Sequence, residues 1–303
     1  MKPEKSERMQ ELKEIKTDSP RLDLAYEYYN RTDVKFQIIK YTQRREFAYL
    51  APRWVWSEAN RRKNGRHFRV HNVHHLDVIM KGKYLLTMHN RFFVNIFASL
   101  ATYKDGVPYR SLQSVDESFK KWEEKIHEHM ESYDLLIDVD SPSHGEEDLT
   151  FAKEGTIEIK KIFDQLNVPH YIRFSGCGFH IVVPGKFLPK KSFDPKDKDN
   201  IYIYCKKIAK YFFDNMTELV DTSIYDSRRI CKIPFTLAHY KRHSYVCLPI
   251  ESGIALNGFD HQKALLHKFN ADLRHYTEKL QNENGNFDKL HKLIFEKDGK
   301  KKK

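Results

Sequence analysis

The sequence predicts a mixed fold of the α/β (α+β) class, built around a central βαβ unit, and three observations predict it. Residues 133–140 (Tyr-Asp-Leu-Leu-Ile-Asp-Val-Asp) form an apolar run of strand length that ends in acids. Residues 147–166 carry apolar side chains at helical spacing. Two short apolar runs, 170–174 and 179–183, flank a Ser-Gly-Cys-Gly turn and are typical of further strands.

Other elements follow along the chain. Helices are expected over four more segments: 21–30, 117–131, 201–219 and 287–295. Residues 36–78 are short, aromatic-rich and strand-like, and further strands are expected within 221–249. Because the chain has no internal repeat and no long linker, we expect a charged flexible start (1–20), one compact two-lobed domain (21–295) and a lysine-rich tail (296–303).

The charge balance favours a polyanionic partner. The 303 residues include 53 Lys and Arg against 42 Asp and Glu, a formal net charge of +11. Basic side chains that neutralise phosphates release condensed counterions, which suits nucleic acid, although a merely soluble basic surface explains the charge equally well. Candidate contacts to a nucleic-acid backbone are residues 61–69, 190–191 and 241–242, and each of these is also compatible with a solvated face.

Membrane and disulfide-rich secreted proteins are disfavoured. No stretch approaches the roughly 20 apolar residues that a membrane span needs, and the N-terminus has no apolar signal core. The four cysteines form no Cys-x-x-Cys pair, so neither a disulfide framework nor a structural zinc site is predicted. An intracellular, reducing setting is expected, which in a prokaryote means the cytoplasm or nucleoid.

The strongest chemical signal is the acid pair Asp138 and Asp140 at the end of the central apolar strand. Residues two apart in a strand point to the same face, so the two carboxylates project together. Their mutual repulsion is relieved by a hard divalent cation such as Mg²⁺ or Mn²⁺, which accepts such oxygens alongside substrate phosphates. An isolated Asp-x-Asp is more often a solvated turn, but the apolar residues before this pair place it at a sheet edge.

Two further segments carry weaker signals. The turn that contains Ser175, Gly176, Gly178 and His180 combines a hydroxyl, an imidazole and glycines that let backbone N–H groups approach phosphate oxygens. Farther along, Asp221 is followed by spaced basic residues, an order that suits a metal ligand beside groups that neutralise a triphosphate. Each segment alone is more simply a tight hairpin with a core histidine, or a surface loop of mixed charge.

Together, these motifs resemble the archaeo-eukaryotic primase superfamily, in particular the small catalytic primase subunit and the stand-alone primase–polymerases. The matching positions, in order, are Asp138 and Asp140, then Ser175, Gly176, Gly178 and His180, then Asp221, and Lys232 two residues before Pro234. Arg45-Glu46-Phe47 is similar to an N-terminal segment of the small subunit. The resemblance covers about residues 45–249, and it implies a mixed-sheet catalytic core with elements like an RNA-recognition module beside a smaller N-terminal α/β unit.

The resemblance implies a role for each matching residue. Asp138, Asp140 and Asp221 would be catalytic and would hold two Mg²⁺ or Mn²⁺ ions. Nucleotide binding would fall to Ser175, Gly176, Gly178, His180 and Lys232, with Arg45, Arg229 and His239 as further contacts. The expected activity is template-directed nucleotidyl transfer, by a DNA primase or primase–polymerase acting on single-stranded DNA and nucleoside triphosphates. A large regulatory primase subunit, or replication and repair proteins, are partners by analogy.

Departures from the family pattern concern its branch. About 35 residues separate the acid pair from Ser175, without Cys or His at metal spacing, so no structural zinc is predicted. The glycine turn is one residue shorter than in typical small subunits. Three alternatives stay open: a gap-filling or end-joining repair polymerase of the same superfamily, a catalytically silent nucleic-acid-binding subunit, and a metal-dependent nuclease. The nuclease would not explain the triphosphate-type Ser, His and Lys.

Overall fold

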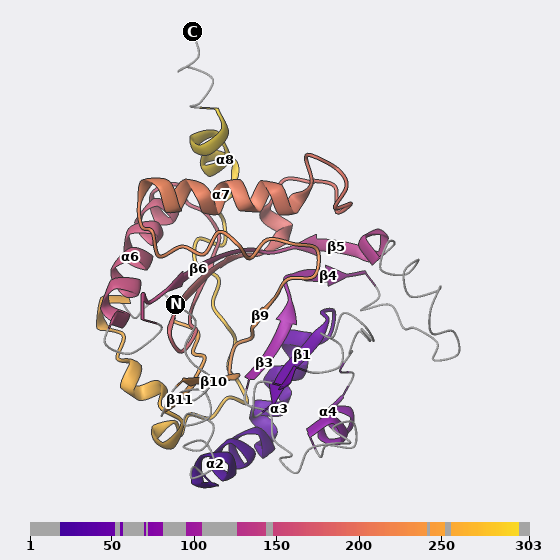
Figure 1. Ribbon diagram of the computed structural model, residues 1–303, viewed down its shortest axis with the longest axis vertical. Helices are drawn as coiled ribbons and strands as arrows, with labels where there is room; N and C mark the ends of the chain where they lie inside the picture. The colour runs from indigo at the N-terminus through magenta and orange to yellow at the C-terminus, as the bar shows by residue number, and fades with distance from the viewer. Residues whose placement is uncertain are drawn as a thin grey trace, which may run out of the picture.

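The computed structural model describes residues 19–51, 55–56, 70, 72–80, 95–104, 126–143, 148–240, 243–251 and 256–296. The fold is the mixed α/β arrangement predicted from the sequence, with small antiparallel sheets covered by helices (Figure 1). No helix in this part of the chain has the length and apolar character needed to cross a membrane.

The N-terminal unit packs helices on a four-stranded antiparallel sheet. Its helices are α2 (Ser19–Asn30), α3 (Thr32–Thr42) and α4 (Val73–Met80), and its first strands are β1 (Phe47–Ala51), β2 (Val55–Trp56) and β3 (Asn95–Ser99). The order β2-β1-β3-β9 is completed by β9 (Ile230–Lys232), which comes from far along the chain. Val34 and Ile38, four residues apart on α3, are buried in one cluster with Phe47 and Ile96 of the sheet.

The central sheet has three strands in the order β6-β8-β7: β6 (Leu135–Asp140), β8 (Gly178–Val183) and β7 (Tyr171–Phe174). Both outer strands pair antiparallel with β8, so β6 and β7 run parallel to each other with β8 between them. The predicted βαβ unit is therefore present, with a third strand inserted. Helix α6 (Leu149–Gln165) connects β6 to β7, and α7 (Ile201–Asn215) follows β8.

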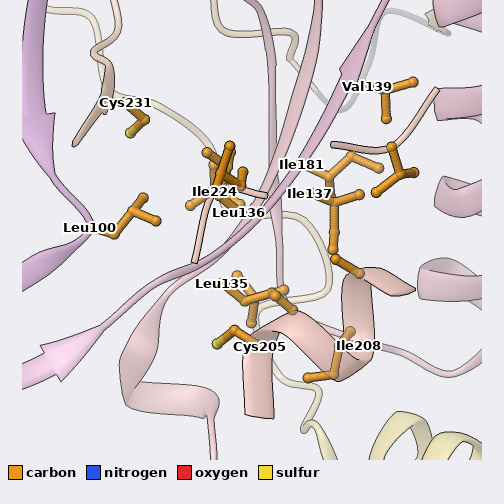
Figure 2. Close-up of a cluster of buried hydrophobic side chains, with 14 of the residues drawn as sticks. Leu100, Leu135, Leu136, Ile137, Val139, Ile181, Cys205, Ile208, Ile224 and Cys231 are labelled. Carbon is orange, nitrogen blue, oxygen red and sulfur yellow. The ribbon is translucent and has the colours of Figure 1, made fainter. Parts of the chain in front are cut away.

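The two faces of β6 have different neighbours. Figure 2 shows Leu135 pointing toward Cys205 and Ile208 of α7, whereas Leu136 lies on the other side of the strand with Ile224. Since side chains alternate along a strand, the even-numbered residues of β6, which include both aspartates, share the face that points away from α7. The helices thus bury one face, and the acids emerge from the other.

The remaining elements are short. Two strand pairs join β4 (Ala101–Tyr103) to β5 (Met130–Tyr133), and β10 (Leu237–Tyr240) to β11 (His243–Val246). Single 3₁₀ turns lie at η4 (Ile126–His129), η6 (Gly185–Phe187), η7 (Leu256–Gly258), η8 (His261–Ala264) and η9 (Leu266–Lys268), and α8 (Asp288–Phe295) comes last. Buried side chains form two clusters, and β9 serves both: Cys231 lies in the cluster of the central sheet, and Ile233, just after the strand, in that of the N-terminal unit.

Some expected elements differ in the structure. The strand-like interpretation of residues 36–78 is wrong at α3 and α4, because Val34, Ile38 and Thr42 are buried at helical spacing despite the β-branched and aromatic composition around them. In the expected helix 117–131, Met130 and Glu131 belong to strand β5 instead, and residues 117–125 lie outside the described part. These are cases in which tertiary pairing overrides local propensity.

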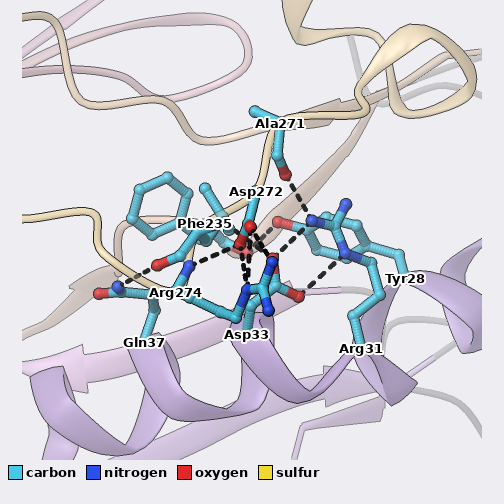
Figure 3. Close-up of polar contacts among 9 residues, drawn as sticks. Tyr28, Arg31, Asp33, Gln37, Phe235, Ala271, Asp272 and Arg274 are labelled. Carbon is cyan, nitrogen blue, oxygen red and sulfur yellow. Dashed lines mark hydrogen bonds and ion pairs between the residues drawn. The ribbon is translucent and has the colours of Figure 1, made fainter.

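A C-terminal strap, residues 271–281, crosses from the N-terminal helices to the central sheet. Figure 3 shows its first half held by Arg31, which links α2 to α3, and by Asp33 and Gln37 of α3. Arg31 forms an ion pair with Asp33 (2.6 Å), whose Oδ2 accepts a hydrogen bond from the backbone N–H of Leu273 (2.8 Å). Gln37 donates from Nε2 to the Leu273 carbonyl (2.7 Å). Side chains of the N-terminal unit therefore fix the path of the strap.

His170, at the start of β7, should make stability sensitive to acid. It is fully buried, and its Nδ1 lies 2.8 Å from the Val168 carbonyl, so Nδ1 carries a hydrogen and donates it. Burial lowers the pKa of His170 below its ordinary 6.5. The unfolded chain therefore binds this proton more readily, and stability is lost as pH falls from 6.5 toward the lowered pKa.

We expect His170→Gln to lose less unfolding free energy than the wild type between about pH 7 and about pH 5. Urea denaturation at both pH values measures this difference, and comparing the two proteins cancels the titration of every other group. Equal losses in the two proteins would show that His170 is not a source of the acid sensitivity.

Candidate functional site

Backbone pairing brings the third aspartate to the acid pair. Val139 of β6 forms an antiparallel bridge with Val220, where the chain emerges after α7. The N–H of Asp221 donates to the Asp138 carbonyl (2.9 Å), and the N–H of Asp140 donates to the Leu219 carbonyl (3.1 Å). Residues opposed across antiparallel strands place their side chains on one face. Asp221 and Asp138 are therefore neighbours on the same face, although 83 positions separate them in the sequence.

The same row continues across the other strands of the sheet. Asp138 is the register partner of His180 on β8, and His180 is the partner of Arg173 on β7. The His180 Nε2 lies 3.5 Å from the Asp138 Oδ1. Four side chains thus stand in line across one face, in the order Asp221, Asp138, His180 and Arg173.

Gly178 allows the second aspartate to sit close to β8. It pairs with Asp140, and a Cβ at this position would lie 2.2 Å from the Val139 carbonyl oxygen and 3.0 Å from the Asp140 Oδ1. Real Cβ atoms do not approach backbone atoms this closely, so only glycine fits. In the structure the close neighbour of Gly178 is strand β6, and the approach of this turn to a phosphate stays a prediction.

The turn before β8 places a hydroxyl in the interior. Gly176 has φ of +101°, a backbone region that L side chains rarely adopt, and the turn closes with a 2.9 Å hydrogen bond from the Ser175 N–H to the Gly178 carbonyl. The Ser175 side chain is buried, and its Oγ has no hydrogen-bond partner within the described residues. An unpartnered buried hydroxyl is costly, so a ligand that engages it would recover free energy.

Lys232 points into the site from β9. Its Nζ donates to the Ser175 carbonyl (3.1 Å) and lies 3.9 Å from the Cys177 Sγ, which in turn is 3.8 Å from the Asp140 Oδ1. The backbone of Lys232 pairs with Phe97 of β3, so the ammonium is delivered by the sheet of the N-terminal unit. The site therefore lies at the junction of the two sheets.

The surroundings of Asp138 disfavour its ionised form. Burial and the neighbouring Asp140 raise the pKa of Asp138 well above its ordinary value, the Lys232 ammonium opposes this, and Asp221 adds to it. Burial also holds the pKa of His180 well below its ordinary value, and Lys232 and Arg173 lower it further, so His180 is a neutral imidazole at neutral pH. A neutral imidazole can donate one hydrogen bond to a phosphate oxygen without neutralising the aspartates.

The aspartates fit a hard divalent cation as partial ligands. The Asp138 Oδ1 is buried and accepts no hydrogen bond from the described residues, and oxygen donors are those that Mg²⁺ and Mn²⁺ prefer. No group of three or more His, Cys, Asp or Glu side chains in this part of the chain is arranged to hold a metal ion by itself. A divalent cation here would need ligands besides these carboxylates, and Mg²⁺ commonly takes waters and substrate phosphates together with one or two carboxylates.

The Arg229 side chain lies beside the site, but its Nη2 bonds to Asp226 and Ser223 and to none of the three aspartates of the site. Its Nη2 forms an ion pair with Asp226 (2.8 Å) and donates to the Ser223 carbonyl (3.3 Å). The Asp221 carboxylate accepts a hydrogen bond from the Ser223 N–H (2.7 Å), which fixes the loop between them. The positive charge of Arg229 still lowers the pKa of Asp138, so Arg229 acts electrostatically on the acid cluster.

The structure does not bring Arg45 to the aspartates. Its Nη2 pairs with Asp134 at 2.6 Å, and its Nη1 donates to the carbonyls of Ser99 and Leu100 (2.8 and 3.0 Å). Asp134 precedes β6, at the opposite end of the strand from Asp140. These contacts engage the Arg45 guanidinium within the protein, and its role as a nucleotide contact stays a prediction.

Other predicted contacts are only partly placed. The backbone of His239 lies in β10, paired with Ser244, and its side chain falls outside the described part. Lys191 forms an ion pair with Asp199 on the surface (2.5 Å). The basic segments 61–69 and 241–242 lie outside the described residues.

Sequence reasoning missed one charged pair next to the site. Arg173 is held by Glu278 of the strap through two hydrogen bonds, Nε to Oε1 (2.5 Å) and Nη2 to Oε2 (2.9 Å). A third goes from its Nη1 to the Tyr41 hydroxyl (3.0 Å). Because 105 residues separate Arg173 from Glu278, no local pattern in the sequence signals the pair.

Comparison with known proteins leaves the site to be interpreted from its own geometry. Several solved structures show a similar arrangement. One of them is the polymerase domain of Mycobacterium tuberculosis Ligase D, solved in complex with DNA, with 11% sequence identity, 75% of this chain and 79% of that chain covered, and a TM-score of 0.46. No protein-family model matches the chain, and no curated protein does. At this sequence identity and TM-score, the likeness assigns no role to any single residue of this chain.

Proposed function

We propose that this protein is a metal-dependent nucleotidyltransferase of the primase–polymerase type, which adds nucleotides to a growing strand on a single-stranded DNA template. The observation that carries the proposal is the row formed by Asp221, Asp138 and His180 on one face of the central sheet. Asp140 and Lys232 stand beside that row. A site with acids at one end and neutral or basic donors at the other suits a nucleoside triphosphate bound through metal.

Each side chain has a distinct task in this proposal. Asp138, Asp140 and Asp221 would hold the cations, which would supply the charge that activates a 3′-hydroxyl and stabilises a pyrophosphate leaving group. Neutral His180 donates a hydrogen bond to a phosphate oxygen, and the Lys232 ammonium neutralises phosphate charge from the β9 side. The unpartnered Ser175 hydroxyl offers one more donor.

The test is incorporation of labelled nucleotides on a single-stranded DNA template, with Mg²⁺ or Mn²⁺ and with ribonucleotides or deoxyribonucleotides in turn. One arm supplies an annealed primer, and the other supplies only template and nucleotides. Products in both arms support a primase, and products in the primed arm alone support a gap-filling or end-joining polymerase. Degradation of the labelled template without incorporation would indicate a nuclease. DNA binding without either reaction would indicate a silent binding subunit.

Lys232 gives a prediction within this assay. We expect Lys232→Met to raise the KM for nucleotide by about 10- to 100-fold, since a half-buried ammonium beside the triphosphate contributes about 1.5–3 kcal/mol through charged hydrogen bonds. Steady-state kinetics at saturating primer–template measures the change. The exposed Lys210, which pairs with Asp214 on α7, is the matched control, and Lys210→Met should leave KM unchanged. An unchanged KM in Lys232→Met would remove Lys232 from the nucleotide site.

A further inference from the structure

Unlike a surface salt bridge, the ion pair between Arg173 and Glu278 is largely enclosed by the protein. The side chains are 3% and 16% exposed. The guanidinium also lies 4.9 Å from the centre of the Tyr41 ring, on which the Arg45 guanidinium packs as well (5.1 Å). Arg173 comes from β7, Tyr41 from α3 and Glu278 from the strap, so three separate segments fix one side chain.

That side chain is the direct neighbour of His180. The two residues are register partners, and their side chains share a face of the sheet. On its other side, His180 faces Asp138 at 3.5 Å. The imidazole therefore lies between Asp138 of the acid cluster and Arg173. The Arg173 guanidinium is held in position by its hydrogen bonds to Glu278 and Tyr41.

The strap determines where Glu278 lies. At one side of Glu278, Tyr276 packs edge-on against Phe235 (4.8 Å between ring centres). At the other, Gln281 pairs with the backbone of His170, at the start of β7, through hydrogen bonds of 3.1 and 2.9 Å. With both flanks anchored, the carboxylate of Glu278 is presented to Arg173 in a defined position.

We propose that Glu278 is a positioning residue for nucleotide binding, which acts through Arg173 to hold His180 against the acid cluster. This inference rests on the proposed function. Arg173 is buried, and its guanidinium is bonded to Glu278 and Tyr41, so in this inference it acts by packing beside the imidazole. Without its pair, the guanidinium is a buried charge without compensation, and it would no longer be held in its place beside His180.

Three variants separate positioning from simple stabilisation. Glu278→Gln leaves Arg173 unpaired. The double variant Arg173→Met with Glu278→Leu removes both charges and fills similar volume, and such replacements of buried pairs are often neutral for stability. Arg31→Met is the matched control, since it breaks the ion pair and the contact to Ala271 at the far end of the same strap.

For each variant we would measure the unfolding temperature, the equilibrium binding of a fluorescent ATP analogue with Mg²⁺, and KM and kcat. We expect the double variant to unfold near the wild-type temperature, yet bind nucleotide about tenfold more weakly, with kcat changed by less than about threefold. Glu278→Gln should weaken both folding and binding, and Arg31→Met should lower the unfolding temperature alone.

Recovery of both stability and nucleotide affinity in the double variant would overturn the inference, because the pair would then be structural only. Equal weakening of binding by Arg31→Met would also overturn it, since the effect would come from the strap in general. If the wild type neither binds nor incorporates nucleotides, the proposed function itself is wrong, and that outcome is distinct from both.

Discussion

Replacing Asp138 and Asp140 together by Asn is expected to reduce metal-dependent nucleotide incorporation by at least about a thousandfold, which is about 4 kcal/mol of activation free energy. An amide has the shape of the carboxylate but no charge to hold a divalent cation. The two side chains lie on the same face of β6, and Val139 between them points to the other face. No adjacent side chain of the strand can therefore take over the role of either aspartate. Primer extension at saturating Mg²⁺ or Mn²⁺ measures the loss.

The same variant is expected to be more stable than the wild type when metal is absent. Burial and Asp140 raise the pKa of Asp138 above its ordinary 3.8, so the ionised carboxylate opposes folding. The sign follows from linkage: with a raised pKa in the folded state, stability is greatest below 3.8 and is lost as pH rises through the raised pKa. Thermal unfolding in EDTA, measured from below pH 3.8 to above the raised pKa of Asp138, should show a smaller loss of stability in the variant than in the wild type.

The exposed Asp214 provides the control, and Asp214→Asn should change neither incorporation nor the pH dependence of unfolding. A double variant that still incorporates nucleotides would contradict the assignment of the acids. A double variant that is less stable in EDTA would show that the carboxylates are structural.

Gly178→Ala is expected to damage folding and activity together. The added methyl group would lie 2.2 Å from the Val139 carbonyl oxygen and 2.9 Å from the Asp140 Cα, and both are backbone atoms that cannot turn aside. Strand β8 must therefore move away from β6 at the position of Asp140. We expect about 1–3 kcal/mol of destabilisation, typical of overpacking. Because a shift of about 1 Å can cost about 10²-fold in rate, incorporation should fall by a similar factor.

Chemical denaturation and primer extension measure the two effects. Gly258→Ala is the matched control, since nothing lies within 4 Å of a Cβ at that position, and it should be silent in both assays. Wild-type activity in Gly178→Ala would mean that the close pairing of β6 and β8 does not position Asp140.

The sequence by itself determined the parts whose signals are local. The apolar run of β6, the helical spacing of α6 and the glycine turn before β8 each result from periodicity or backbone freedom within a few residues. The face shared by Asp138 and Asp140 follows from strand geometry alone. By contrast, the β-branched and aromatic composition of α3 predicts a strand, and only the burial of its side chains reveals the helix.

Only the tertiary structure decided which distant side chains meet. Asp221 reaches Asp138 through hydrogen bonds between backbone groups, which are the same for every residue type and leave no trace in the sequence. Arg45 is drawn to Asp134 instead, and Arg173 to Glu278, because a buried guanidinium must find a carboxylate in its surroundings. Local patterns specify strands, turns and acids; the folding of the whole chain selects the partner of each charge.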